Sequence, residues 1–492
     1  MPLFPHRRRA AAAIAALAAL AATGSCGRRP DVGPVVASVI GGAPELAGRT
    51  RAAMPTGDRL LTDALAEGLV RFDAAGQIEP GVAERWIVTD EGMSYIFRLR
   101  NARWPDGAPV RAAEVVALLR RQIAAASGND IAPYLSAVAS VVEMTPEVIE
   151  IELSRPRPDL LKLFAQPELA LVRARPAGGA GPFRRKEERH QALLLSPAID
   201  PDRDPDEARP APEDEVLLRG ERAASAIVRF VERDSDLVTG GTIADWPLVQ
   251  AANPAPVNIR IDPAAGLFGL AVVRRDGFLA DAANRAAVAQ AIDRADLATG
   301  ISPDWVARDT VLPEQLDSAL APAIPLWASV PAEQRADAAR ATVARWRAAH
   351  GVPQLGIALP GGPGGTLLWA RIARDLYAIG IRPVRLAPDD AGADLRLVDR
   401  VAPYDSARWY LAEACVACSE QAAAAIEAAR LADTLAGRAQ ALATADAALA
   451  SDVAFVPLGR PFRWSLVALR LRQWQANARA WHPLNRLRAD TN

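Results

Sequence analysis

The chain has few of the residues that usually carry out catalysis or bind metals. Its 492 residues include only three cysteines and four histidines. His190, His350 and His482, the histidines beyond the first ten residues, lie far apart in the sequence. A zinc site needs three or four such ligands at suitable spacings, which this distribution does not provide. The sequence therefore predicts no metal site and no bound cofactor.

Motifs of hydrolases and nucleotide-binding proteins are also missing. The sequence contains no G-x-S-x-G, H-E-x-x-H or S-x-x-K. The glycine-rich residues 360–365 lack both the G-x-G-x-x-G spacing and a following Lys-Ser/Thr pair. They predict an ordinary turn between a strand and a helix, with backbone amides that could hold at most a small anion. The net charge is −1 and no basic stripe alternates with aromatic residues, so we expect neither an enzyme nor a nucleic-acid partner.

No hydrophobic run is long enough to span a membrane. The longest, residues 10–22, falls short of the ~20 residues that a spanning helix needs. It follows Arg7, Arg8 and Arg9, and this order is typical of a secretory signal. Residues 23–26 (TGSC) then resemble a bacterial lipobox. We expect residues 1–25 to be a signal peptide, Cys26 to be acylated and residues 26–34 to form a tether, with ordinary cleavage after residue 24 or 25 as the alternative.

Cys415 and Cys418 are the only cysteines that follow Cys26. In an exported protein this close spacing favours a local disulfide. A redox-active pair is the alternative, because Ser419 opens an alanine-rich helix and a helix N-terminus lowers the pKa of a nearby thiol. The βαβ surroundings of a thioredoxin-type site are not evident upstream of the pair. We therefore expect a structural disulfide.

Hydrophobic periodicity predicts alternating strands and helices. Residues 35–40 are β-branched and precede a Gly-Gly pair, which predicts a buried strand. Two hairpins are expected, over residues 70–78 and 86–100. Further strands are predicted at 148–153, 267–273, 355–359 and 384–386, and helices at 63–70, 111–123, 223–231, 282–294 and 366–379. This alternation is typical of an α/β layer architecture.

Several segments along the chain resemble one known family. The first are residues 67–70 (EGLV), 76–86 (GQIEPGVAERW), 90–100 (DEGMSYIFRLR) and 104–115 (WPDGAPVRAAEV). The later ones are residues 179–183 (GAGPF), 281–294 (ending AIDR), 378–381 (AIGI) and 455–458 (FVPL). In this order they are similar to the family 5 solute-binding proteins, the extracytoplasmic receptors of peptide/nickel-type ABC importers. Arg111 departs from the family pattern, since a threonine usually caps the helix at that position.

The resemblance implies an α/β protein with the two-lobed fold of type II-like periplasmic binding proteins and an extra domain inserted in the first lobe. Lobe I would comprise residues 31–55, 178–265 and 450–492, the inserted domain residues 56–177, and lobe II residues 266–449. The ligand would bind between the lobes, which close over it by a hinge motion. Such a site needs apolar walls and one or two buried charges rather than catalytic groups.

Asp399 and Arg396 are the candidate ligand-binding residues that the resemblance implies. In peptide-binding members of the family, an aspartate four residues before a proline pairs with the α-amino group of the ligand. Asp399 keeps that spacing before Pro403. Arg396 stands where the family often has tryptophan, which implies a different ligand chemistry. The alternative for Asp399 is a loop carboxylate paired with Arg396 or Arg400.

The function implied is that of a monomeric, non-enzymatic receptor on the periplasmic side of the cell envelope. It would capture a small solute, in the first place a short peptide, and deliver it to an ABC permease in the cytoplasmic membrane. Nickel complexes and oligosaccharides are alternative solutes, although scarce histidine disfavours direct ligation of nickel. Two other functions stay open, an envelope thiol-redox protein using Cys415 and Cys418 and a degenerate receptor acting as a sensor or scaffold.

Overall fold

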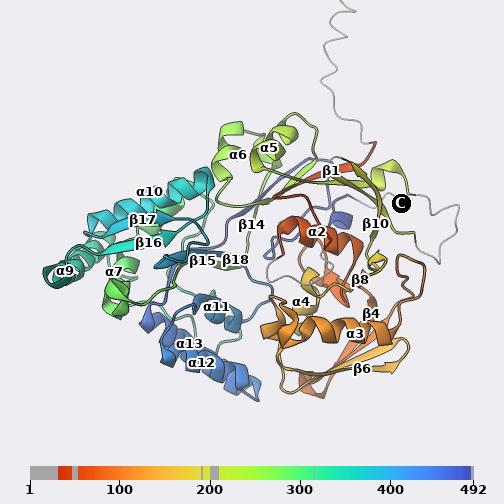
Figure 1. Cartoon of the computed structure of the whole chain (residues 1–492), viewed down its shortest axis with the longest axis horizontal. Helices are drawn as coiled ribbons and strands as arrows, with labels where there is room; N and C mark the ends of the chain where they lie inside the picture. Colours follow the sequence, from red (N-terminus) through yellow and green to blue (C-terminus); the bar gives the residue numbers. More distant parts are fainter. Residues whose placement is uncertain (1–31, 47–53, 190–191, 200–209, 315, 489–492) are drawn as a thin grey trace, which may run out of the picture.

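The computed structural model describes residues 32–46, 54–189, 192–199, 210–314 and 316–488. Cys26 and the expected signal peptide lie outside the described residues. Two mixed sheets and one antiparallel sheet organise this part of the chain (Figure 1). Among the helices of these ranges, none is both long enough and apolar enough to cross a bilayer.

The first sheet has seven strands and forms the core of lobe I. Its order is β10 (Phe183–Arg189), β11 (Ala192–Pro197), β12 (Val216–Glu221), β1 (Val35–Ile40), β13 (Leu237–Gly241), β20 (Arg463–Val467) and β14 (Ile259–Asp262). The β-branched strand β1 is buried along almost its whole length and pairs in parallel with β12 and β13. Helices α5 (Ala223–Val231) and α2 (Thr56–Leu65) pack against it from opposite sides (Figure 1). The expected strand at residues 35–40 is confirmed.

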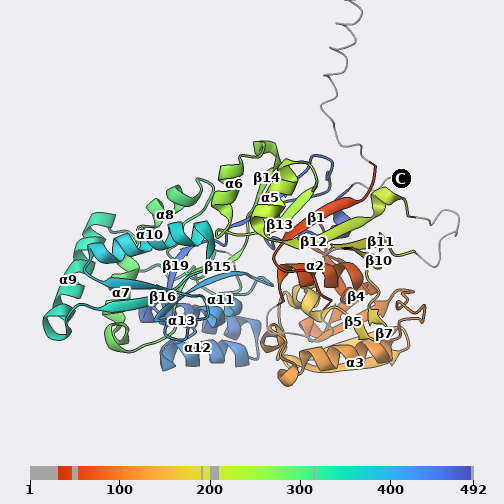
Figure 2. The same ribbon diagram turned by 45° about the horizontal axis from the view of Figure 1, so that its top comes forward.

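The second sheet has five strands and forms the core of lobe II. Its order is β17 (Arg382–Leu386), β16 (Gln354–Ala358), β18 (Leu395–Val401), β15 (Gly266–Val272) and β19 (Phe455–Gly459). The helices of this lobe are α7 (Ala282–Ala291), α8 (Arg294–Ile301), α9 (Ala332–His350), α10 (Gly362–Ala378), α11 (Ala407–Ala414), α12 (Glu420–Leu431) and α13 (Leu435–Asp452). In Figure 2, α8 and α10 lie above the sheet and α12 and α13 below it.

Strand β19 corrects the expected division of the chain. Residues 450–492 were assigned to lobe I, but β19 pairs antiparallel with β15 in the five-stranded sheet. Only β20 returns to the seven-stranded sheet, where it pairs with β13 and β14. The chain therefore passes between the two sheets twice, from β14 to β15 and from β19 to β20.

Residues 56–177 contain a four-stranded antiparallel sheet, in the order β4 (Ala83–Thr89), β5 (Ser94–Leu99), β7 (Val148–Leu153) and β6 (Val138–Thr145). They also hold the β-ribbons β2–β3 (Val70–Phe72, Ile78–Pro80) and β8–β9 (Arg173–Ala174, Ala177–Gly178), with α3 (Ala112–Ile123) and α4 (Leu160–Phe164). Both predicted hairpins are confirmed. Arg111 precedes α3 and makes no side-chain capping bond, as its departure from the family pattern predicted. This sheet and α3 lie on the far side of α2 from β1 (Figure 2). A short helix in lobe I, α6 (Trp246–Ala252), completes the set of α-helices in the described ranges.

The helix expected at residues 63–70 is wrong. Helix α2 begins at Thr56 and ends at Leu65, and the next residues run extended into β2. Leu69 is fully buried from this extended segment, so its spacing from Leu65 does not reflect helical periodicity. Gly68 passes so close to a neighbouring backbone that a Cβ would lie 2.4 Å from the Phe164 oxygen.

The single helix expected at residues 282–294 is two helices. Helix α7 ends at Ala291, and Asp293 caps the start of α8. The Asp293 carboxylate accepts hydrogen bonds from the backbone nitrogens of Ala295 (3.0 Å) and Asp296 (3.1 Å). A carboxylate in this position satisfies amides that have no partner within the helix, so it starts a new helix.

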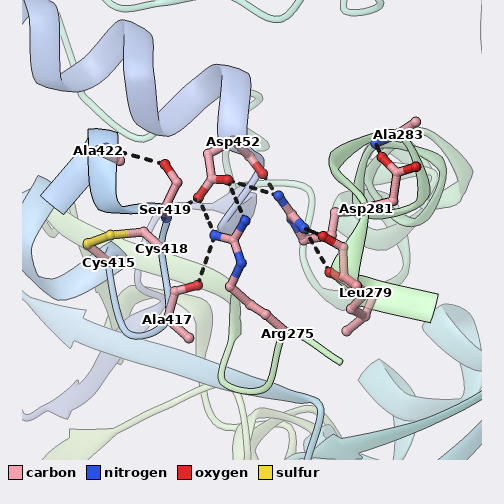
Figure 3. A network of polar contacts seen from close by, with 12 residues as sticks. Arg275, Leu279, Asp281, Ala283, Cys415, Ala417, Cys418, Ser419, Ala422 and Asp452 are labelled. Atoms are coloured by element: carbon pink, nitrogen blue, oxygen red, sulfur yellow. Dashed lines mark hydrogen bonds and ion pairs between the residues drawn. A yellow bond between two sulfur atoms is a disulfide. The ribbon is translucent and has the colours of Figure 1, made fainter. Parts of the chain in front are cut away.

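A buried carboxylate at the end of α13 joins several parts of lobe II (Figure 3). Asp452 accepts two hydrogen bonds from Arg275 (2.6 and 2.7 Å), one from Arg285 (2.8 Å) and one from the backbone nitrogen of Ser419 (2.8 Å). The Arg285 side chain is only 1% exposed. Burial raises the pKa of Asp452, but the bonds from Arg275 and Ser419 outweigh it and leave the pKa below its usual value.

We predict that Asp452→Ala lowers the free energy of unfolding by about 3 kcal/mol, because it leaves the buried Arg285 charge without its partner. In the wild type, this contribution is complete above the unfolded pKa of 3.8 and is lost as the pH falls through the lower folded value. Urea denaturation at pH 7 measures the change. The control is Asp337→Ala, which breaks the exposed Asp337–Arg340 pair and should cost less than about 0.5 kcal/mol. Equal effects of the two substitutions would contradict the prediction.

Candidate ligand-binding site

A cavity of about 310 Å³ lies where the two sheets and the inserted domain meet. Strand β18 and residues 402–403 form one wall, and the ends of β13, β14 and β20 form another. The inserted domain supplies α2, residues 130–134, Gln166 and Glu168, and the C-terminal segment supplies residues 479–482. Five aromatic residues are among those that line it, namely Phe72, Tyr134, Trp409, Trp464 and Trp481. The cavity therefore draws on all three parts of the expected fold.

Asp399 lies in this cavity, on strand β18 rather than on a loop. It forms an ion pair of 2.7 Å with Arg463, which comes from β20 of the other sheet. Arg463 also donates to the Asp399 backbone oxygen, at 3.1 Å. Burial raises the pKa of Asp399, and Arg463 offsets this only in part. The protein partner of Asp399 is thus neither Arg396 nor Arg400, the two that sequence proximity suggested.

Arg396 does not line the cavity. It stands three residues before Asp399 on the same strand, and an odd separation places two side chains on opposite faces of a sheet. Its guanidinium donates to the Asp390 backbone oxygen at 3.2 Å. The structure therefore separates the two residues that the resemblance brought together.

Arg400 links lobe II to the inserted domain. Its guanidinium bonds the carboxylates of Asp130, in the inserted domain, and Glu413, on α11 (2.6 Å). Tyr134 of the inserted domain donates to the same Glu413 at 2.7 Å. Burial opposes the charge of Arg400, but Glu413 and Asp130 outweigh it and raise the pKa of the guanidinium. These bonds close one side of the cavity.

A second group of polar contacts closes the cavity beside residue 403. Lys162 of the inserted domain bonds Asp405 of lobe II at 2.5 Å, and Asp405 also pairs with Arg479. Gln166 donates to the Pro403 oxygen at 2.6 Å. The inserted domain and lobe II are thus joined by direct polar contacts on two sides of the cavity.

The remaining charged groups around the cavity have partners within the protein. Arg59 pairs with Glu168 at 3.1 Å and lies 5.0 Å over the Trp481 ring. Asp262 contacts Nε2 of His482 at 3.1 Å. No nucleophilic side chain is bonded to His482 in the described ranges, and no group of three or more metal-binding side chains occurs there. This arrangement of paired charges and aromatic side chains can bind and orient a solute.

Cys415 and Cys418 form a disulfide, with their Cα atoms 5.0 Å apart. The loop between them follows α11 and precedes α12, whose first turn is capped by the Ser419 side chain. Arg275 and Asp452 hold the loop through the Ala417 oxygen and the Ser419 nitrogen (Figure 3). The pair is therefore built into the packing of lobe II.

Comparison with known proteins identifies the family. The sequence profile of the bacterial extracellular solute-binding proteins, family 5 (middle region), matches residues 77–342, more than half of the chain. The chain belongs to this family. As a family 5 protein, it shares the two-lobed fold of the Haemophilus influenzae protein OppA, solved in complex with RPPGFSPFR. The TM-score is 0.76 and the sequence identity 16%, over 92% of this chain and 98% of the other.

Curated relatives of this family 5 protein match over shorter stretches. The probable deoxycholate-binding periplasmic protein YgiS of Escherichia coli is 32% identical over 123 residues, 21% of this chain and 23% of that protein. The periplasmic oligopeptide-binding protein OppA of Haemophilus influenzae is 38% identical over 87 residues, 18% of this chain and 16% of that protein. The matched stretch thus spans a quarter or less of each of these relatives.

Sequence reasoning found Asp399 but missed its partner Arg463 and the contacts of Arg400. Asp399 and Arg463 are 64 positions apart, and Arg400 and Asp130 are 270 apart. No local pattern marks pairs at such distances. One signal in the sequence could have pointed to the aromatic side chains of the cavity. Trp464 and Trp481 are large side chains that stand beside basic residues near the C-terminus.

We predict that Asp130→Ala shifts the protein toward an open arrangement of the lobes, because Arg400 then loses its contact with the inserted domain. A partly exposed ion pair is worth about 1 kcal/mol, which changes the ratio of closed to open molecules about fivefold. Small-angle X-ray scattering of the ligand-free protein should show a larger radius of gyration. The control is Asp106→Ala, which breaks the Asp106–Arg173 pair (3.1 Å) within the inserted domain. An unchanged radius for Asp130→Ala, or the same increase for both, would refute the prediction.

Proposed function

We propose that this protein is an extracytoplasmic receptor that captures a small solute, a short peptide in the first place, between its lobes and delivers it to an ABC permease. The observation that carries the proposal is the cavity, which is shared by both lobes and the inserted domain and contains Asp399. Its volume of about 310 Å³ lies at the lower end of the range for ligand pockets, which favours a solute the size of a very short peptide. The protein binds its solute and does not convert it.

The names of the relatives support a peptide or a similarly sized solute. One solved relative contains the peptide RPPGFSPFR, and one curated relative is named for binding deoxycholate. Another solved relative contains a nickel–histidine complex. We place the peptide first because Asp399 offers a carboxylate for an ammonium group. Among the described residues, Arg463 contacts only Oδ1 of that carboxylate, which leaves Oδ2 for the ligand.

We further propose that the receptor acts as a monomer on the periplasmic side of the cell envelope and is lipid-anchored through Cys26. The support for the anchor is the leader sequence, which consists of a basic start, an apolar run and the residues TGSC. A receptor tethered beside its permease would be held close to the protein that receives its solute. A degenerate receptor that senses rather than transports would keep the same cleft, and only transport measurements in cells separate these two functions.

A thermal-shift screen tests solute binding directly. A ligand that binds only the folded state stabilises it by about 2.7 kcal/mol at a hundred times its Kd. We expect di- and tripeptides with a free α-amino group to raise the melting temperature at millimolar concentration. Native mass spectrometry of the purified protein should show a bound mass in the same range. No shift with any of these peptides would exclude peptide as the solute class.

Asp399→Asn tests the role of the carboxylate while keeping its shape. We expect about tenfold weaker binding of a free-amine peptide, because an ammonium–carboxylate bond is lost, and no change for the N-acetylated form of the same peptide. Isothermal titration calorimetry measures both. Arg396→Ala is the control on the opposite face of the strand and should leave binding of both peptides unchanged. An equal loss for the free and acetylated peptides would rule out pairing with the amine.

The disulfide separates the receptor from the thiol-redox alternative. We expect the double variant Cys415→Ser/Cys418→Ser to lose about 2 kcal/mol of unfolding free energy, as loop-closure entropy for this short loop predicts. We also expect the wild type to be no more active than the variant in reducing or reoxidising a test disulfide protein. Thiol exchange by the wild type that disappears in the variant would favour the redox function.

A further inference from the structure

A second chamber adjoins the polar cavity along strand β18. Its volume is about 450 Å³, and it shares Thr242, Asp399 and Arg400 with the first. The two chambers are therefore parts of one cleft that meet at the end of β18. The ends of β13 and β16, from the two different sheets, face this second chamber. A solute held at the junction can reach into both.

The second chamber differs from the first in chemistry. Its lining is mainly apolar, namely Ile243, Ala244, Ala358, Pro360, Pro388, Leu397, Val398 and Val416. The polar members are Thr242, Asp399, Arg400 and Glu413. Three of these are the shared residues, and Glu413 is bonded to one of them, Arg400. All polar groups of the chamber thus belong to the junction, and the rest of its wall is apolar.

Val416 has a special position in this wall. It lies within the disulfide loop, and its side chain is 54% exposed although it is apolar. The disulfide, the Arg275 bond to the Ala417 oxygen and the Asp452 bond to the Ser419 nitrogen hold the loop from both sides (Figure 3). Because these contacts already order the backbone of the loop, little further loop entropy is lost when a ligand covers Val416. An exposed apolar side chain on an anchored loop that lines an apolar chamber is suited to contact an apolar group.

We propose that the second chamber receives an apolar group of the solute, whose charged group is held at the Asp399–Arg400 junction. The inference rests on the proposed function and specifies its substrate class, a small amphipathic solute such as a dipeptide with a large apolar side chain. The size fits, because a 150 Å³ cavity already holds benzene and this chamber is about three times as large. Val416 is then a specificity-determining residue.

A homologous series of ligands tests the proposal on the intact protein. We expect the Kd, measured by calorimetry, to fall along alanyl-glycine, alanyl-alanine, alanyl-valine and alanyl-leucine by roughly threefold to fourfold for each added methylene group. Octanoate forms a second arm, which distinguishes an amphipathic peptide from an amphipathic carboxylate without an amine. Binding of octanoate alone would support the chamber but overturn the peptide as solute. Peptide binding that does not depend on side-chain size would overturn the chamber and leave the receptor function intact. No binding in either arm would overturn both.

Val416→Ser tests whether Val416 contacts the apolar side chain of the ligand. We expect about fivefold weaker binding of alanyl-leucine, because its leucine side chain would contact Val416. Binding of alanyl-glycine should be unchanged, because glycine has no side chain that could make this contact. The control is Val352→Ser, a valine 56% exposed that lines neither chamber. Because both valines are exposed, neither substitution should prevent folding. Equal effects on the two dipeptides, or the same effect from Val352→Ser, would overturn the role of Val416.

Discussion

The architecture depends on the two places where the chain passes between its sheets. Strands β14 and β15 are joined by residues 263–265, and β19 and β20 by residues 460–462. The first passage is so close to β18 that a Cβ on Gly266 would lie 2.1 Å from the Arg400 oxygen, and Gly266 adopts a φ of +155°. Strand β18, which carries Asp399 and Arg400, is therefore packed directly against one of the two connections between the sheets.

The cleft is lined by charges that are already paired. Arg463 balances Asp399, Asp130 and Glu413 balance Arg400, and Glu168 balances Arg59. An unpaired buried charge would cost several kcal/mol, so this pairing lets the lobes close without a ligand of opposite charge. A ligand ion must then share or replace existing partners, which limits the affinity that charge alone can give. Burial of apolar surface in the adjoining chamber carries no such cost, and this is why the apolar wall matters for affinity.

Most of the strands and helices that local patterns predicted are present, and the resemblance to the family predicted the two lobes. The β-branched run at residues 35–40 became β1, and the hairpin expected at residues 86–100 became β4 and β5. The errors arose where tertiary contacts override local preference. Leu69 is buried although it lies outside any helix. Strand β19 belongs to lobe II because it pairs with β15. Within the site, the resemblance to the family pointed to Asp399, whereas Arg463 became visible only when the fold had brought β18 and β20 together.

The inserted domain acts as part of the binding site rather than as an addition to lobe I. Asp130 contacts Arg400 on β18, whereas Tyr134 and Lys162 contact Glu413 on α11 and Asp405 just before it. Helix α11 carries Glu413 and continues directly into the disulfide loop, which Asp452 holds in place. Asp405 and Glu413, which contact the inserted domain, and Val416, which lines the apolar chamber, therefore lie on one short segment, residues 405–418. That segment is fixed at its far end by the disulfide and by the Arg275–Asp452 ion pair, so residues of one anchored part of lobe II border both chambers.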